Sequence, residues 1–209
     1  MSMSHAVRKQ IEDVLRRVEE TLQTAQHGLD DLLGKDAARH YTGLRNLIVF
    51  GRSVTFVLQN LRGIVGIDFD AWYEPQKVAM SADPLMRYFV QSRNELEKQG
   101  KLSVGHSLHI SSFSVADMAR FGAPPVGAVS FFIGDSVGGT GWVVKAAEGA
   151  TEKYYVELPA DIGVVRRHFA NLLSKDAPDL QGRTIEELSA EYVGRLRALV
   201  GRAQTHFLN

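Results

Sequence analysis

The spacing of apolar residues follows the α-helical period over the first hundred residues and then changes to the period of a β-strand. From about His5 to Leu33, apolar side chains recur every three or four positions, which predicts one long helix. From Leu102 to Ile110, apolar and polar residues alternate, which is typical of a strand. We therefore predict an α+β fold: a mainly helical bundle of about six helices with a small antiparallel β-sheet insert near residues 102–158.

The second predicted helix, from about Asp36 to Leu61, is apolar almost all round, which indicates a central helix. Its polar residues recur every seven positions and so form one narrow seam, made of Arg45–Asn46, Arg52–Ser53 and Gln59–Asn60. Arginines interrupt this apolar stretch, and one arginine near the centre of a membrane-spanning helix costs about 2.5–3.5 kcal/mol. We predict a buried helix and no membrane partner.

Start and stop signals place the other helices. A short helix is predicted at 68–79, and Asp83-Pro84 begins a helix that Gly100 closes. Two helices finish the chain, one at about 161–174 and one that opens with a capping box at Thr184. We predict a single domain over residues 1–209, in which the helical framework is formed by residues 5–100 and 161–207.

The composition excludes several classes of function. The 24 basic and 24 acidic residues give no net charge, so no overall field attracts nucleic acid or membrane. No cysteine is present, which excludes disulfides and thiolate metal sites. The histidines show no metal-ligand spacing, and the glycine-rich segment 134–141 lacks the Lys-Ser/Thr pair of a phosphate loop, so we predict a hairpin connection there and no metal or cofactor. The first residues lack the apolar core of a secretory signal, which predicts a cytoplasmic protein.

Arg93 is the candidate functional residue of the helix that begins at Pro84. Helical spacing puts it on the same face as Leu85, Phe89 and Leu96, so its side chain should point partly inward. A buried arginine needs a partner because an unpaired buried charge is costly. Two partners are open: a bound phosphate, or a local acid such as the glutamate four residues later.

The long helices with a polar seam, together with the Arg93–Asn94 pair late in a helix, resemble the HEPN family (higher eukaryotes and prokaryotes nucleotide-binding) of helical bundles. The resemblance covers residues 5–100 and the last helices. Ribonucleases of that family carry a histidine a few residues after the arginine, where this chain has Lys98. The resemblance implies catalytic roles for Arg93, Asn94 and Lys98, with His106 or His109 supplied from elsewhere in the fold.

By the same resemblance, Arg45 and Arg52 are expected to bind nucleic acid. The protein is expected to act on RNA as a homodimer in bacterial defence or toxin–antitoxin biology. It would be either a metal-independent endoribonuclease or a catalytically impaired relative.

Two other functions remain open. The missing histidine, the neutral charge and the exposed strand edges of the insert favour a non-catalytic protein–protein interaction module, which recruits a protein partner. A small-molecule enzyme or sensor would instead use Asp135, Trp142 and Tyr154–Tyr155 around a pocket in the sheet.

Overall fold

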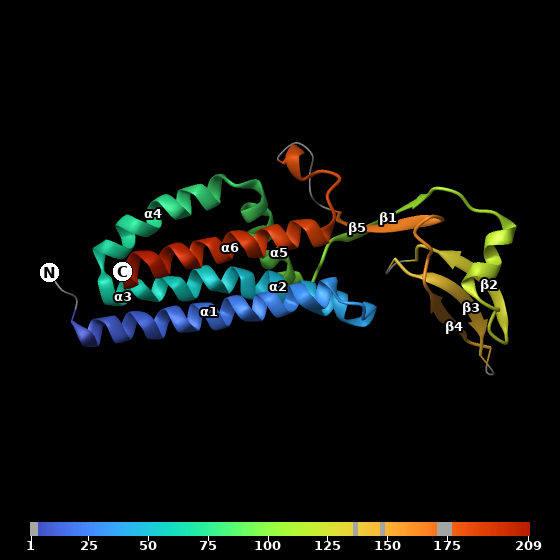
Figure 1. The fold of residues 1–209 in the computed structure, drawn as a ribbon, viewed down its shortest axis with the longest axis horizontal. Coiled ribbons are helices and arrows are strands. Elements are labelled where there is room, and N and C mark those ends of the chain that lie inside the picture. The colour runs from blue at the N-terminus through green and yellow to red at the C-terminus, as the bar shows by residue number, and fades with distance from the viewer. Residues whose placement is uncertain (1–3, 136–137, 147–148, 171–176) are drawn as a thin grey trace. The chain divides into compact units, whose positions relative to one another are not determined.

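The computed structural model describes residues 4–135, 138–146, 149–170 and 177–209, and it confirms a mainly helical α+β fold (Figure 1). The chain divides into two compact units. The helical unit lies within residues 1–103 and 172–209, and the sheet unit lies within residues 104–171. The prediction of a single domain stays a prediction.

Six α-helices form the described part of the helical unit, and most begin at the cap that the sequence predicts. Ser4, Asp36, Asp83 and Thr184 each accept a hydrogen bond from a backbone N–H in the first turn of the helix that follows. The helices are α1 (His5–Leu33), α2 (Ala37–Leu58), α3 (Arg62–Val65), α4 (Ile67–Ala82), α5 (Pro84–Gln99) and α6 (Ile185–Leu208), with a short 3-10 helix (Gln59–Leu61) after α2.

The helices α1, α2 and α6 run side by side (Figure 1), and the backbones of α1 and α2 nearly touch at two glycines. A Cβ atom on Gly28 would lie 2.6 Å from the carbonyl oxygen of Gly43. A Cβ atom on Gly43 would lie 2.6 Å from the carbonyl oxygen of Gly28. Only glycine at both positions permits this approach, because any side chain would overlap the opposite backbone.

A second close approach joins α6 to α2 and α5. The ring of Tyr192 stacks on Phe89, with centroids 4.0 Å apart and ring planes 2° apart. The same ring lies against Gly51, where a Cβ atom would be 2.5 Å from Cε1 of the tyrosine. Tyr192 is therefore a central core residue, and aromatic stacking adds about 0.5–1.5 kcal/mol to the burial of its surface.

The sheet unit contains five described strands in two antiparallel sheets. A two-stranded sheet pairs β1 (Val104–Ile110) with β5 (Gly163–Phe169), and a three-stranded sheet has the order β2 (Ala128–Ile133), β3 (Thr140–Lys145), β4 (Thr151–Val156). A 3-10 helix (Val115–Phe121) precedes β2. Phe121 packs 4.7 Å from the ring of Phe131, which in turn packs 4.8 Å from Trp142 on β3.

The prediction of a helix at 161–174 is wrong over its first half, and residues 171–174 lie outside the described residues. Residues Gly163–Phe169 form β5 instead, which pairs with β1 from Val104 opposite Phe169 to Ile110 opposite Gly163. The physical reason is tertiary: the partner strand lies some sixty residues earlier, so no local pattern reveals it, while the β-branched Val164–Val165 pair suits a strand. The sheet unit consequently extends well past residue 158, and its strands form two sheets rather than one.

The helix α2 is also less enclosed than predicted. Leu44, Leu47 and Leu58 are buried, but the side chains of Phe50 and Phe56 are 37% and 45% exposed. Within the described residues, no helix combines the length and the apolar character needed to cross a membrane. The cytoplasmic location stays a prediction.

We expect Gly43→Ala to lower the free energy of unfolding by about 1–3 kcal/mol, because the new methyl group would push α1 away from α2. Urea denaturation followed by circular dichroism measures this change. Gly63→Ala is the matched control, since nothing lies within 4 Å of a Cβ atom there, and it should be neutral or stabilising by up to about 1 kcal/mol. Equal effects of the two substitutions would contradict the close approach.

Candidate functional site

Arg93 on α5 has a local partner. Its Nη2 lies 2.7 Å from Oε2 of Glu97, four residues later, and its Nη1 donates to Oδ1 of Asn94 at 3.3 Å. The side chain is about one quarter exposed, as its inward position predicts. Of the two partners that the sequence left open, the structure shows the local acid, so a phosphate at Arg93 would have to compete with Glu97.

Phe56 on α2 brings two of the predicted arginines together. The guanidinium of Arg52 lies 4.2 Å from the centre of this ring, and that of Arg93 lies 5.7 Å from it. Arg52 also donates to the hydroxyl of Thr55. Two cations thus share one exposed aromatic ring, in a geometry that favours cation–π attraction.

The other predicted site residues lie elsewhere. Arg45 donates from Nη2 to the carbonyl oxygen of Gly100 at 3.0 Å, which ties α2 to the end of α5. Lys98 is exposed in the last turn of α5. His106 belongs to β1 in the sheet unit, where it lies opposite Arg167 in the strand register, and His109 is exposed on the same strand. Arg93 and His106 thus belong to different compact units, and the joining of the predicted catalytic set in one site stays a prediction.

Arg52 and Asn94 do line a common cleft, of about 630 Å³, between α2, α4 and α5. Lys77 and Arg87 lie at the same cleft, and no aspartate or glutamate is among its described lining residues. Sequence reasoning missed Lys77 and Arg87, and no local signal could have found them, because they stand on different helices. Only the packing of α4 and α5 against α2 brings these three cations to one place.

Two tyrosines, Tyr73 and Tyr192, also line this cleft. Burial raises the pKa of Tyr73, and Arg52 opposes part of that rise. Burial also raises the pKa of Tyr192, again with Arg52 acting in the opposite direction. The pKa of each phenol therefore lies above the ordinary value for tyrosine.

The raised pKa of Tyr192 makes stability depend on pH in a defined direction. Above pH ~10, unfolded tyrosines lose their protons while Tyr192 in the folded protein keeps its own, so folding stability should fall as pH rises. We expect Tyr192→Phe to make the fall in melting temperature between pH 8 and 10.5 smaller than in the wild type. Tyr154→Phe, at an exposed tyrosine, is the control and should leave the fall unchanged. An unchanged pH dependence in Tyr192→Phe would contradict this assignment.

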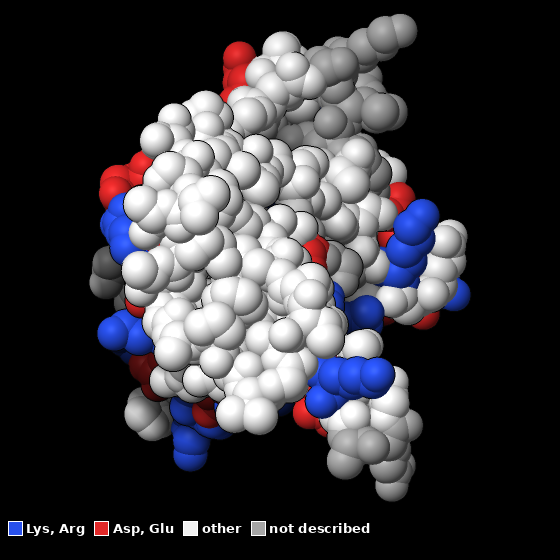
Figure 2. Space-filling model, turned by 90° about the vertical axis from the view of Figure 1, so that its right-hand side faces the viewer, with Lys and Arg blue, Asp and Glu red and all other residues white. Residues whose placement is uncertain are grey.

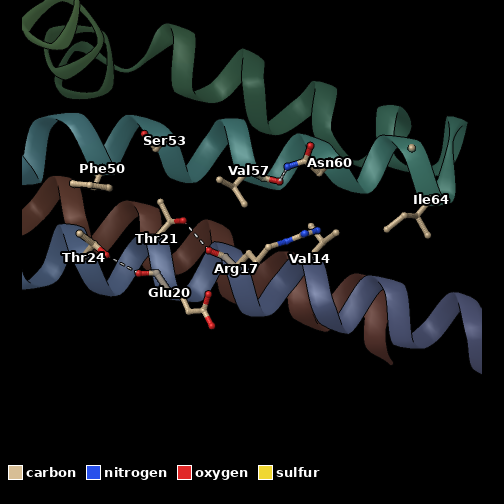
Figure 3. Close-up of a pocket in the computed structure, with 11 residues that line it drawn as sticks. Val14, Arg17, Glu20, Thr21, Thr24, Phe50, Ser53, Val57, Asn60 and Ile64 are labelled. Carbon is tan, nitrogen blue, oxygen red and sulfur yellow. Dashed lines mark hydrogen bonds between the residues drawn. The ribbon is translucent and has the colours of Figure 1, made fainter. Parts of the chain in front are cut away.

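A second hollow, a groove of about 810 Å³, runs between α1, α2 and α3 (Figure 3). Its three hydroxyl groups form hydrogen bonds within their own helices. The hydroxyls of Thr21, Thr24 and Ser53 each donate to a backbone carbonyl one turn earlier. The amide of Asn60 donates to the carbonyl of Val57. The groove therefore offers methyl groups and apolar side chains beside the exposed charged side chains of Arg17 and Glu20, which also line it.

The polar seam of α2 divides between these two hollows. Arg52 and Gln59 line the cleft, whereas the residues that follow them, Ser53 and Asn60, line the groove. Neighbouring positions on a helix point about 100° apart, so a seam two residues wide can reach both sides of α2.

In the sheet unit, Asp135 organises the glycine-rich connection between β2 and β3. Its carboxylate is 7% exposed and accepts hydrogen bonds from the N–H of Gly139 at 2.8 Å, from Lys153 at 2.6 Å and from the hydroxyl of Tyr155 at 2.9 Å. The predicted hairpin connection is confirmed. Because the carboxylate of Asp135 already accepts these three hydrogen bonds, its position gives no support to a catalytic carboxylate in the sheet.

The same unit carries a surface without formal charge. Residues 121–134, here called the uncharged segment, contain no Lys, Arg, Asp or Glu. Two of its valines, Val126 and Val129, are 99% and 60% exposed. Figure 2 shows a broad area without Lys, Arg, Asp or Glu, with charged side chains of both signs around it. An exposed apolar face of this kind is uncommon in a monomer.

The comparisons with known proteins give one match. The model of a family described as bacteriophage lambda protein ea47 matches residues 11–118, which include most of α1, all of α2 to α5 and β1, and part of the 3-10 helix that follows. No curated protein matches this chain, and neither does any solved structure.

This match corrects the resemblance to HEPN proteins, which is wrong: the family whose model fits the chain is a different one. A short Arg-Asn pair and long helices are features that unrelated helical proteins share, and the Arg93–Glu97 pair explains the inward arginine without a nucleic acid. The ribonuclease function and the catalytic roles rested on that resemblance, and the comparisons give no support to them or to RNA as a partner. The match extends over more than half of the 209 residues, and the chain belongs to the bacteriophage lambda protein ea47 family.

Proposed function

We propose that this protein is a non-catalytic protein–protein interaction module that binds a second copy of itself through the uncharged segment of its sheet unit. The observation that carries the proposal is the exposure of Val126 and Val129 within fourteen residues that bear no charge. Burial of apolar surface stabilises an interface by roughly 25 cal/mol per Å², and an interface core is depleted of charged residues.

The charges nearest to this segment in the sequence are already paired. Arg120, which precedes it, lies 3.4 Å from Asp117 and 2.7 Å from Asp161. These pairs neutralise the charged groups of the 3-10 helix, so they leave little net charge beside the uncharged segment. Val115, at the start of the same helix, is 89% exposed and adds to the apolar surface of the sheet unit.

A second copy is the partner that this surface fits best. In a two-fold dimer the same patch meets itself, so a charge near the axis would lie close to the same charge of the other copy. A segment without charge avoids this repulsion, and the chain as a whole has no net charge to oppose association. A partner of a different kind is commonly selected by charge complementarity, for which this segment offers nothing.

The edges of the three-stranded sheet add to this argument. The strands β2 and β4 are its outer strands, and Tyr154 and Tyr155 on β4 are each about half exposed. Unpaired backbone groups on an edge strand are ready to pair with another chain, and tyrosines are common contact residues at interfaces. Pairing at an edge would extend the contact beyond the uncharged segment.

Light scattering after size-exclusion chromatography tests the proposal. Wild-type protein at about 100 µM should have twice the 23.1 kDa mass of one chain, and Val126→Glu with Val129→Glu should raise the dimer dissociation constant at least about tenfold, because each glutamate would face its own copy. Val78→Glu is the matched control, since Val78 is also 60% exposed but lies on α4 of the helical unit. A wild-type monomer at this concentration, or a double variant that still dimerises, would contradict the proposal.

A further inference from the structure

The cleft between α2, α4 and α5 has the dimensions of a small-molecule site. Its volume of about 630 Å³ lies within the range of roughly 300–1,000 Å³ that ligand pockets occupy. The lining comes from three helices and from Tyr192 of α6, so the cleft is built by the tertiary packing of the helical unit.

Arg52 is the partly buried cation of this cleft. It donates to the hydroxyl of Thr55 and lies over the ring of Phe56, and it makes no ion pair with any carboxylate in the described part of the chain. A guanidinium has five N–H donors, and a hydroxyl and a ring use only part of that capacity. A carboxylate or a phosphate offers two oxygens in the geometry that a guanidinium matches.

Elsewhere in the helical unit, arginines of similar exposure have carboxylate partners. Arg93 lies 2.7 Å from Glu97. Arg195 forms ion pairs with both Asp83 and Glu191. The partly buried arginines of α5 and α6 thus each have a carboxylate partner. Arg52 in the cleft has none among the described residues, and Lys77 and Arg87 add further positive charge there.

The remaining surface of the cleft suits the body of an organic molecule. Phe56, Met80, Met86 and Val90 provide an apolar wall. Thioether side chains adapt their shape to apolar ligands, and the ring of Phe56 offers a face for stacking. Tyr73 also lines the cleft, where its hydroxyl forms a hydrogen bond with Thr55, the residue to which Arg52 donates.

We propose that this cleft binds a small organic anion, whose carboxylate or phosphate lies against Arg52 and whose apolar body lies against Phe56 and the two methionines. The site is separate from the uncharged segment and does not depend on dimer formation. Lys77 and Arg87 at the margin raise the local concentration of anions.

Nuclear magnetic resonance of methyl-labelled methionine tests the proposal directly. Met80 and Met86 line the cleft, and Met118 lies in the sheet unit as an internal reference. The probes are phenyl phosphate and benzoate, with phenol as the neutral analogue and inorganic phosphate as the anion without an apolar body. Phenyl phosphate or benzoate should shift the signals of Met80 and Met86 and leave Met118 in place, and the tighter of the two identifies the preferred anionic group.

Arg52→Gln should weaken binding of that probe at least about tenfold, which is the scale expected when a charged hydrogen bond is lost. Arg87→Gln, at an exposed rim position, should weaken it less and provides a second variant if Arg52→Gln disturbs the fold. Arg16→Gln, an exposed arginine of α1 outside the cleft, removes the same charge and should have no effect. The proposal is overturned if neither anion shifts the two methionines at about 10 mM, if phenol or inorganic phosphate acts as well as they do, or if Arg52→Gln and Arg87→Gln both bind like the wild type.

Discussion

The contact between the backbones of α1 and α2 at Gly28 and Gly43 is the constraint on which the helical unit depends. It brings α1 and α2 together without intervening side chains, so that the leucines on either side of the crossing are buried. With α2 fixed in this way, Gly51 leaves room for Tyr192, and α6 packs against α2 and α5 through one stacked ring pair. Three small residues therefore determine how closely the bundle can pack.

This close packing also determines what α2 offers to its surroundings. Its two sides open onto different hollows, and their chemistry differs because the seam residues on each side differ. On one side, Arg52 faces a cleft whose described lining has cations and neutral hydroxyls but no carboxylate. On the other side, the hydroxyls and the amide of the groove are bonded to backbone carbonyls nearby, so α2 presents mainly Phe50 and Val57 to the charged side chains of Arg17 and Glu20 on α1. One helix thus supplies both a polar and an apolar surface.

The sheet unit differs from the helical unit in how its apolar and charged side chains are buried. Its strands are short, its two sheets have two and three strands, and its core rests on a few aromatic contacts such as Phe121, Phe131 and Trp142. So small a unit cannot bury all of its apolar side chains, and the valines of the uncharged segment remain exposed. The buried Asp135 differs, since its carboxylate accepts from Gly139 of its own connection and from Lys153 and Tyr155 of β4. The hydroxyl of Thr140 and Nε1 of Trp142, by contrast, are buried without a hydrogen-bond partner among the described residues, and the valines of the uncharged segment stay exposed.

The sequence by itself determined the elements that local rules control. Asp36, Asp83 and Thr184 marked helix starts, and helical spacing put Arg93 on the inward face of α5, because caps and periodicity act within a few residues. Tertiary structure decided the pairing of β5 with β1, the partner of Arg93, and the meeting of Arg52, Lys77 and Arg87 at one cleft. The strand pairing and the cleft join residues that lie on different elements. For Arg93, two possible partners compete for the same guanidinium. Their outcome depends on how whole helices and strands pack, which no short stretch of sequence specifies.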